Sequence, residues 1–109
     1  MLAKWKLFML GYRIIETNYR TRKGEIDIIA RDKCELVFVE VRSRSGGEYG
    51  TPEESVDARK VKKLTELAMT YIAQKSLYDI PARFDVVSVD FSRFYPKITV
   101  IKNAFEAVE

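Results

Sequence analysis

The sequence contains no histidine and only one cysteine, Cys34. Without histidine it cannot form a Ser-His-Asp or Cys-His catalytic group, nor a zinc site with imidazole ligands, so acid-base chemistry falls to carboxylates and lysines. A single cysteine cannot form an internal disulfide, which argues against a secreted, disulfide-stapled domain. We therefore expect a cytoplasmic protein.

Long apolar segments are also missing. No run approaches the roughly 20 apolar residues of a membrane-spanning helix. Residues 1–10 are apolar apart from Lys4 and Lys6, and no small-residue cleavage site follows them, so we expect neither a signal peptide nor membrane association. The chain of 109 residues, 47% hydrophobic and 32% charged, is typical of one folded domain, which we place at residues 1–109.

The net charge of +3 is too small to indicate a nucleic-acid partner, but the positive charge is unevenly distributed. Residues 1–24 contain six cations and one acid. Two basic segments stand out: Arg20, Arg22 and Lys23, and further along Arg59, Lys60, Lys62 and Lys63. These segments are either solvated surface or, if the chain binds a phosphate backbone, part of the contact.

Hydrophobic periodicity and turn residues predict the order α-β-β-β-α-β-β. The expected helices cover residues 1–10 and 51–74, and the expected strands cover residues 12–17, 25–31, 36–42, 82–91 and 98–102. Thr51 is the expected cap of the second helix, and Asn103 the expected cap of a short terminal helix. Trp5, Tyr71 and Phe84 are expected in the core. This order predicts an α/β fold in which helices flank a mixed central sheet.

Charged side chains occupy unusual positions in the hairpin expected from residues 25–31 and 36–42. If residues 32–35 form its loop, Asp27 lies directly opposite Glu40. The same register places Glu25 opposite Arg42, on the same face, because side chains alternate with period two. Like charges at directly opposed positions destabilise a sheet, so something should offset the repulsion between the two acids.

A divalent cation such as Mg²⁺ or Mn²⁺ would offset this repulsion. Such ions bind carboxylate, carbonyl and water oxygen, which makes Asp27, Glu40 and the carbonyl of Val41 candidate ligands. A bound ion could activate water for attack on a phosphodiester, with Arg42 holding the phosphate. The alternative, a solvated face on which Arg42 and a neighbouring cation neutralise the acids, remains open. A salt bridge between Glu25 and Arg42 would likewise explain Glu25 without catalysis.

These residues resemble a known motif. Asp27, followed thirteen positions later by Glu40-Val41-Arg42, resembles the PD-(D/E)xK signature of restriction-endonuclease-like nucleases, among them the archaeal Holliday-junction resolvases. More specific strings resemble the bacterial YraN-type family over nearly the whole chain: Asn18-Tyr19-Arg20, Gly24-Glu25-Ile26-Asp27, Val37-Phe38-Val39-Glu40-Val41-Arg42 and Arg83-Phe84-Asp85-Val86-Val87. Gly11-Tyr12, Lys60 and Ala104-Phe105 also fit that family.

The resemblance implies a restriction-endonuclease-like fold, a divalent cation on Asp27 and Glu40, and a nucleic acid as partner. It matches Lys60 to a basic position that related nucleases place on the following helix, near the phosphate. Two features depart from the family pattern. Arg42 stands where Lys is usual, which excludes a lysine base at that position. The pattern also has a Glu on the first helix, before Ala3, which this sequence does not contain.

These observations lead to the hypothesis of a Mg²⁺- or Mn²⁺-dependent nuclease that acts on structured or branched DNA. Its candidate catalytic residues are Asp27, Glu40, Arg42, Lys60 and Glu25, and its candidate nucleic-acid contacts are Arg20, Arg22, Arg44, Lys62 and Lys63. A homodimer is a possible assembly, since resolvases of this superfamily are commonly dimers. Two alternatives stay open, a catalytically inactive nucleic-acid-binding module and a protein-protein adaptor.

Overall fold

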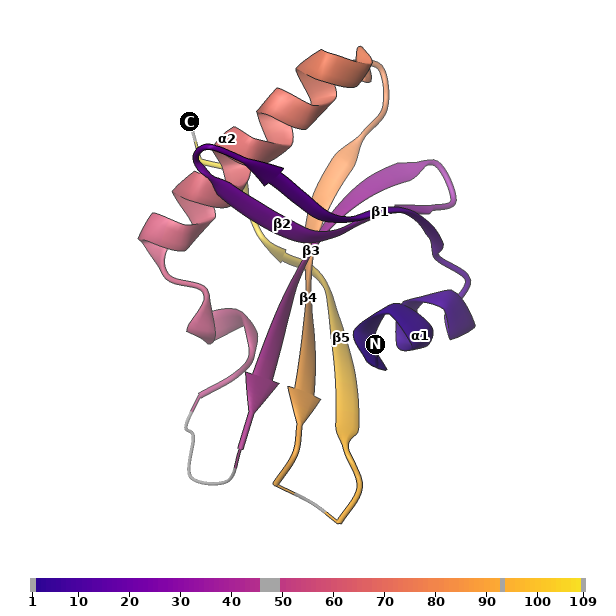
Figure 1. Ribbon diagram of the computed structural model, residues 1–109, viewed down its shortest axis with the longest axis vertical. Helices are drawn as coiled ribbons and strands as arrows, with labels where there is room; N and C mark the ends of the chain where they lie inside the picture. The colour runs from indigo at the N-terminus through magenta and orange to yellow at the C-terminus, as the bar shows by residue number, and fades with distance from the viewer. Residues whose placement is uncertain (1, 46–49, 93, 109) are drawn as a thin grey trace.

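The computed structural model describes residues 2–45, 50–92 and 94–108. Its elements are α1 (Leu2–Met9), β1 (Arg13–Thr21), β2 (Gly24–Asp32), β3 (Glu35–Arg44), the 3-10 turn η1 (Glu53–Ser55), α2 (Ala58–Lys75), β4 (Ala82–Asp90) and β5 (Lys97–Phe105). The five strands form a sheet in the order β1-β2-β3-β4-β5 (Figure 1). β3 and β4 are parallel and joined through α2, and the other neighbours are antiparallel. The predicted α/β fold with a mixed sheet is confirmed.

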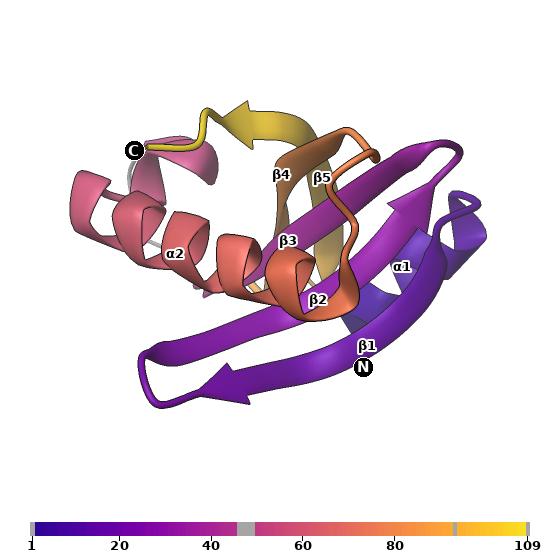
Figure 2. The ribbon, with the colours of Figure 1, turned by 90° about the horizontal axis from the view of Figure 1, so that it is seen from above.

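One helix covers each face of the sheet (Figure 2). Leu64 and Tyr71 of α2 pack in a buried cluster with Phe38. Leu7 of α1 packs on the opposite face in a cluster with Val39, the neighbour in β3 whose side chain points the other way. The helices therefore flank the sheet as the sequence predicted. Neither helix in the described part of the chain is long and apolar enough to cross a lipid bilayer.

The predicted core is confirmed for two of the three aromatic residues. Tyr71 and Phe84 are buried, but Trp5 is 56% exposed. α1 has only eight residues, and Ala3 and Leu7, one helical turn apart, form its buried stripe. The indole of Trp5 lies outside that stripe, so the prediction for this residue is wrong.

β1 is longer than the sequence indicated. Residues 18–24 were expected to form a connection, but β1 continues almost to the turn and stays paired with β2. Asn18 adopts a left-handed φ of 54°, which asparagine tolerates better than most residues, and pairing resumes with Tyr19 opposite Ile26. Tyr19 then packs edge-on against Tyr71, with 5.2 Å between ring centroids. This contact holds the end of the hairpin against α2.

β2 separates from β3 part-way along its length. Their pairs run from Asp32 opposite Glu35 to Ile28 opposite Val39, in the predicted register but with a two-residue turn instead of a four-residue loop. Beyond the last pair, β2 stays with β1, while β3 stays with β4 and β5 (Figure 1). We call residues 19–26 of the β1–β2 hairpin the hairpin arm.

We call the point of separation, at Asp27 and Glu40, the strand fork. Two expected pairings beyond it are wrong. Asp27 and Glu40 are not a ladder pair, and Glu25 pairs with Arg20 of β1 instead of Arg42. The reason is that the backbone of β2 follows β1 away from β3 at this point.

α2 begins later than predicted. The expected capping box forms, with the Thr51 N–H donating to Glu54 Oε1 at 3.1 Å and the Glu54 N–H donating to Thr51 Oγ1 at 3.4 Å, but it caps only η1. Asp57 is the N-cap of α2, and its Oδ1 accepts the Lys60 N–H at 2.9 Å. The helix ends at Lys75, one residue beyond the expected end.

The terminal helix expected after Asn103 does not form in the described residues. β5 continues through Asn103 to Phe105, and Asn103 has a φ of 51° at a register shift between β4 and β5. Its backbone N–H donates to Asp85 Oδ1 at 3.0 Å. Asn103 therefore lies at an irregularity in β5 instead of capping a helix.

Candidate functional site

The strand fork brings Asp27 to β3 through its side chain. Asp27 Oδ2 accepts the backbone N–H of Val41 at 2.8 Å. Because β2 no longer runs beside β3 at this point, the carboxylate supplies the acceptor that a neighbouring strand would otherwise offer. The bond fixes the Asp27 carboxylate beside the residue that follows Glu40.

Glu40 is the buried acid of the fork, with 5% of its surface exposed. Its Oε2 lies 3.2 Å from Arg42 Nε and 3.6 Å from Lys60 Nζ. Burial raises the pKa of Glu40, and the charge of Asp27 and a hydrogen bond with it raise the pKa further, against the opposing effect of the two cations. The structure therefore brings Asp27, Glu40, Arg42 and Lys60 into one cluster.

Arg42 carries an unsatisfied donor inside this cluster. Its Nε is buried and has no hydrogen-bond partner among the described residues, because the contact with Glu40 is at ion-pair distance without the alignment of a hydrogen bond. A buried unpaired donor costs about 1–3 kcal/mol, so an additional oxygen at this point would be stabilising. The predicted salt bridge to Glu25 is not formed, since Glu25 Oε2 lies 2.8 Å from Arg20 Nε.

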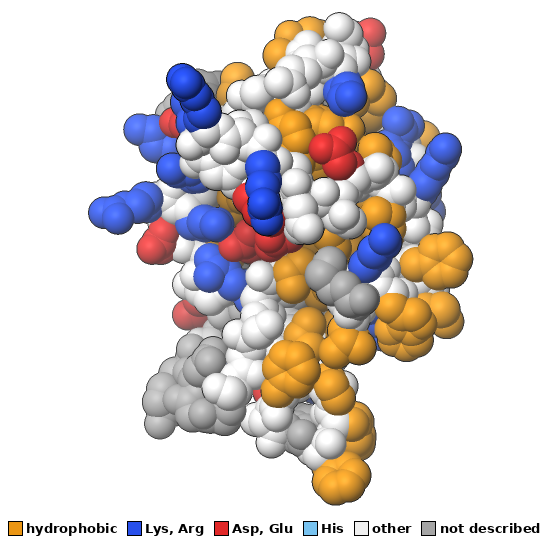
Figure 3. Space-filling view, viewed as in Figure 1, with side chains coloured by type: hydrophobic (Ala, Val, Ile, Leu, Met, Phe, Trp, Pro, Cys, Tyr) orange, Lys and Arg blue, Asp and Glu red, His pale blue; other side chains and the backbone are white. Residues whose placement is uncertain are grey.

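A pocket of about 510 Å³ opens beside the cluster, between the hairpin arm and the start of α2. It is lined by Lys23, Gly24, Glu25, Arg42, Ser55, Asp57, Arg59, Lys60 and Lys63. Figure 3 shows Lys and Arg side chains gathered over α2 and the hairpin turn, with acidic side chains among them. Two basic segments that lie far apart in the sequence thus meet at one surface, next to a buried acid.

The other predicted contact residues are distributed differently. Lys63 lines the pocket, whereas Lys62 is exposed and is not among the described residues that line it. A smaller hollow of about 320 Å³ at the hairpin turn is lined by Arg20, Thr21, Arg22, Lys23, Gly24 and Glu25. Arg44 Nη2 donates to the carbonyl oxygen of Gly50 at 2.9 Å, so its guanidinium is engaged with the backbone.

The oxygen donors of the fork suit a hard divalent cation. Mg²⁺ is typically held by one or two carboxylates together with water, and Asp27 and Glu40 provide that number. Within the described ranges no group of three or more His, Cys, Asp or Glu side chains is arranged to hold a metal.

The family model described as "Uncharacterised protein family UPF0102" matches residues 1–89. The chain belongs to this family. A UPF0102 protein of Geobacter metallireducens is 47% identical over 95 residues, which cover 87% of this chain and 78% of the relative. A UPF0102 protein of Moorella thermoacetica is 50% identical over 97 residues (87% and 81%), and one of Geobacter sulfurreducens is 43% identical over 106 residues (96% and 83%). The YraN-type family predicted from the motifs is confirmed.

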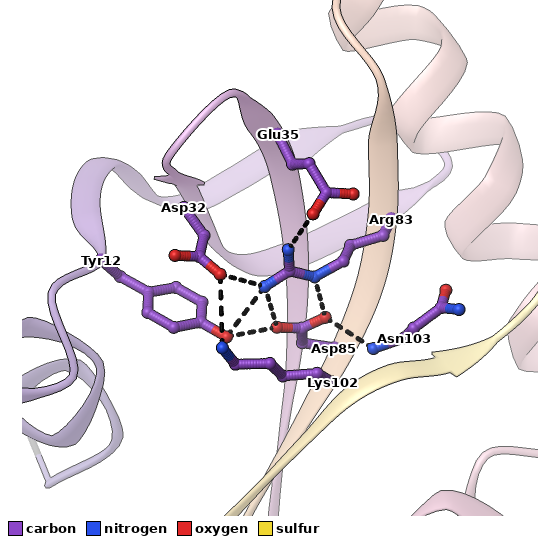
Figure 4. A network of polar contacts seen from close by, with 7 residues as sticks. All are labelled: Tyr12, Asp32, Glu35, Arg83, Asp85, Lys102 and Asn103. Atoms are coloured by element: carbon purple, nitrogen blue, oxygen red, sulfur yellow. Dashed lines mark hydrogen bonds and ion pairs between the residues drawn. The ribbon is translucent and has the colours of Figure 1, made fainter.

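The structure also contains a polar network that sequence reasoning missed (Figure 4). Arg83 lies at its centre: its Nε is 2.9 Å from Asp85 Oδ1, its Nη1 is 2.6 Å from Glu35 Oε1 and its Nη2 is 2.7 Å from Asp32 Oδ2. The Tyr12 hydroxyl donates to Asp85 Oδ2 at 2.7 Å. Asp85 has no exposed surface.

This network joins strands in the UPF0102 fold. A hydrogen bond from Arg83 lowers the pKa of Asp32, and burial together with a hydrogen bond to Asp85 raises the pKa of Tyr12. Tyr12 packs in the cluster on the α1 face, whereas Glu40 lies toward α2, so the network is separate from the strand fork. The available sequence signal was the pair Arg83 and Asp85, two charges on the face of β4 that otherwise carries Val87 and Val89.

Proposed function

We propose that this UPF0102 chain is a metal-dependent nuclease of restriction-endonuclease-like fold that hydrolyses phosphodiester bonds in structured or branched DNA. The strand fork carries the proposal, because it holds two carboxylates, Asp27 and Glu40, against cations from two different elements. The α-β-β-β-α-β-β order around a mixed sheet supports the fold assignment. Carboxylates that can hold a cation, next to side chains that can hold a phosphate, are the minimum that this chemistry requires.

In this proposal Asp27, Glu40 and the carbonyl of Val41 hold Mg²⁺ or Mn²⁺. A bound ion would supply Lewis-acid chemistry at the phosphoryl group, so that water could attack without a histidine base. The Arg42 guanidinium, whose Nε lies 3.2 Å from Glu40 Oε2 and has no hydrogen-bond partner among the described residues, donates to an oxygen of the scissile phosphate. Lys60 presents its positive charge to the same phosphate from the first turn of α2.

The environment of the Glu40 carboxylate supports a cation site at the strand fork. Burial and the neighbouring Asp27 both disfavour the ionised form of Glu40, which is why its pKa is raised. Metal binding requires deprotonated ligands, so a divalent cation between the two carboxylates would take the place of the proton. The same ion would remove the repulsion that was expected between the two acids.

The proposal is tested by Mn²⁺-dependent cleavage of a labelled four-way junction and of a plain duplex. Asp27→Asn and Glu40→Gln should each lower the cleavage rate at least about 100-fold, since each removes a proposed metal ligand. Asp79→Asn, an exposed carboxylate between α2 and β4, is the matched control and should cleave like the wild type. Cleavage that persists in both fork variants, with their folding verified by circular dichroism, would refute the proposal.

A specific observation favours a second candidate function. Arg42 stands where the resembling nucleases usually have Lys, and its guanidinium cannot lose a proton near neutral pH. A binding module without turnover would keep salt-sensitive affinity for DNA and show no cleavage with Mg²⁺ or Mn²⁺. Arg42→Lys discriminates between the two: cleavage that appears only in this variant would identify a fold that is competent but inactive in the natural chain.

A further inference from the structure

The pocket between the hairpin arm and α2 is lined by more Lys and Arg side chains than the two that contact Glu40 at the strand fork. Its lining includes five cations: Lys23, Arg42, Arg59, Lys60 and Lys63. Both acids of the lining are already engaged. Glu25 Oε2 lies 2.8 Å from Arg20 Nε, and Asp57 Oδ1 accepts the first-turn N–H of Lys60 at 2.9 Å.

The five cations divide into two groups. Arg42 and Lys60 lie against Glu40. The other three, Lys23, Arg59 and Lys63, are exposed and form no ion pair with a residue that the structure describes. Like charges repel, so three unpaired cations around one pocket favour an anion between them.

The fold fixes the distance between the two sides of this pocket. Gly24 has a φ of 150°, and a Cβ there would lie 3.4 Å from Cδ of Lys63 and 3.5 Å from Cδ1 of Leu67. The stem of Lys63 therefore lies beside the backbone of the hairpin arm, at ordinary van der Waals distance, and the φ of 150° at position 24 favours glycine. Further along the arm, the Tyr19 hydroxyl donates to Gln74 Oε1 at 2.8 Å. The arm is thus held against α2 at two points.

We propose that Lys23, Arg59 and Lys63 form a site for a second phosphate of the nucleic-acid strand whose scissile phosphate lies at Glu40. This inference rests on the proposed function, because it takes the fork as the reacting centre. The Arg59 guanidinium presents several N–H donors in one plane, and the two lysines supply point charges. This combination is suited to phosphate oxygens. The site lies between the hairpin arm and α2, so it favours nucleic-acid strands that continue from the scissile phosphate into this pocket.

Binding in EDTA tests the site without turnover. Fluorescence anisotropy with a labelled DNA duplex, over a series of NaCl concentrations, gives the slope of log affinity against log salt. Arg59→Gln, Lys63→Gln and Lys23→Gln should each reduce the magnitude of that slope by about 0.9, the change expected for one lost phosphate contact. Lys75→Gln, an exposed cation at the other end of α2, is the matched control and should not change it. Pocket variants that behave like Lys75→Gln would overturn the site.

Three DNA forms distinguish the source of the phosphate. Linear duplex with a 5′-phosphate, linear duplex with a 5′-hydroxyl and closed circular duplex are compared as competitors. If the pocket variants weaken binding of all three alike, the site takes an internal phosphate of the strand. If they weaken only the 5′-phosphorylated form, it takes a terminal phosphate. Both results support the site, and weakening of none overturns it.

Failure of the site and failure of the nuclease proposal give different results. Salt-sensitive binding that depends on Arg59 and Lys63, with no cleavage by wild type in Mn²⁺, would retain the pocket and reject the nuclease. Metal-dependent cleavage of DNA whose rate and salt slope are unchanged in both variants would retain the nuclease and reject the pocket. Asp79→Asn should keep the wild-type salt slope in EDTA, because this exposed carboxylate does not line the pocket.

Discussion

Glu40 Oε2 lies 3.6 Å from Lys60 Nζ, which joins the buried acid of β3 to the first turn of α2. The contact depends on where the helix begins, since Asp57 caps α2 by accepting the backbone N–H of Lys60. A helix beginning at Thr51, as the sequence suggested, would have placed Lys60 more than two turns into it. The start of α2 therefore positions a cation at the strand fork.

The pH dependence of stability should change in Glu40→Gln. The pKa of Glu40 is raised in the folded protein above its ordinary value of 4.5, first by burial and then by Asp27. Below pH 4.5 the Glu40 carboxyl is protonated in both the folded and the unfolded protein, so it does not destabilise the fold. As pH rises through the raised pKa of the folded protein, the carboxyl ionises at a buried position and the free energy of unfolding falls. Glu40→Gln mimics the protonated form, so we expect it to be more stable than wild type at pH 8 and little different at pH 4.

Thermal unfolding in EDTA between pH 4 and pH 8 checks this prediction. Each unit of pKa difference corresponds to about 1.4 kcal/mol. Asp27→Asn is the companion variant, because removing its charge should lower the pKa of Glu40 and reduce the advantage of glutamine at pH 8. A wild type that gains stability relative to Glu40→Gln as pH rises would show that the cations outweigh burial.

Lys60→Gln should separate metal binding from turnover. Removing a cation 3.6 Å from Glu40 lowers the repulsion that a divalent ion meets, so we expect Mn²⁺ affinity to rise by about 3-fold or more. Cleavage should fall at least about 10-fold, because the phosphate loses a positive contact. Calorimetry and a cleavage assay measure the two effects, with Lys75→Gln as control. A parallel fall in both would mean that Lys60 acts only by holding Glu40.

Arg83→Met should strongly destabilise the fold. Arg83 is the cation of a network that includes the fully buried Asp85, and removing one partner of a buried ion pair costs about 3–5 kcal/mol. Lys102→Met is the matched control: Lys102 Nζ lies 3.5 Å from Asp32 Oδ2, but its side chain is 59% exposed, so the cost should be below about 1 kcal/mol. Urea unfolding measures both, and equal losses would contradict the assigned role of Arg83.

The cap that the sequence predicted for α2, Thr51, can be compared directly with the cap that the structure shows, Asp57. Asp57→Ala should lower the free energy of unfolding by about 1 kcal/mol, since it removes the N-cap of α2. Thr51→Ala removes the cap of the three-residue η1 and should cost less, because α2 does not depend on it. Urea unfolding of both variants tests the order, and a larger loss for Thr51→Ala would restore the helix start read from the sequence.

Local rules predicted the sequence of elements because each depends on neighbouring residues. Hydrophobic periodicity predicted α2, whose buried residues include Val61, Leu64 and Tyr71, and the period-two pattern predicted β2 and β3 with their register near the turn. The same rules could not predict the strand fork. Whether β2 stays with β3 or leaves with β1 depends on the twist of the whole sheet and on the packing of Tyr19 against Tyr71.

The candidate site was predicted only in part, because local rules place residues along a strand but do not show how distant segments meet. Asp27 and Glu40 were paired by register arithmetic, and they do meet at the fork, but through the Asp27 side chain and the Val41 N–H. Arg42 reaches Glu40 from two positions further along β3, whereas Lys60 reaches the same acid because α2 begins directly after its N-cap Asp57. The charged pair Arg83 and Asp85 was visible in the sequence, but its partners Tyr12, Asp32, Glu35 and Asn103 come from four other segments that only the fold brings together.

Calorimetric titration of Mn²⁺ at low salt, into wild type, Asp27→Asn and Glu40→Gln, is the most direct test for a metal site at the strand fork. We predict saturable binding in wild type that is lost in both variants, while Glu25→Gln, whose carboxylate is paired with Arg20, keeps it. Absence of saturable binding to wild type, or binding that survives in both fork variants, would contradict a metal site at the strand fork.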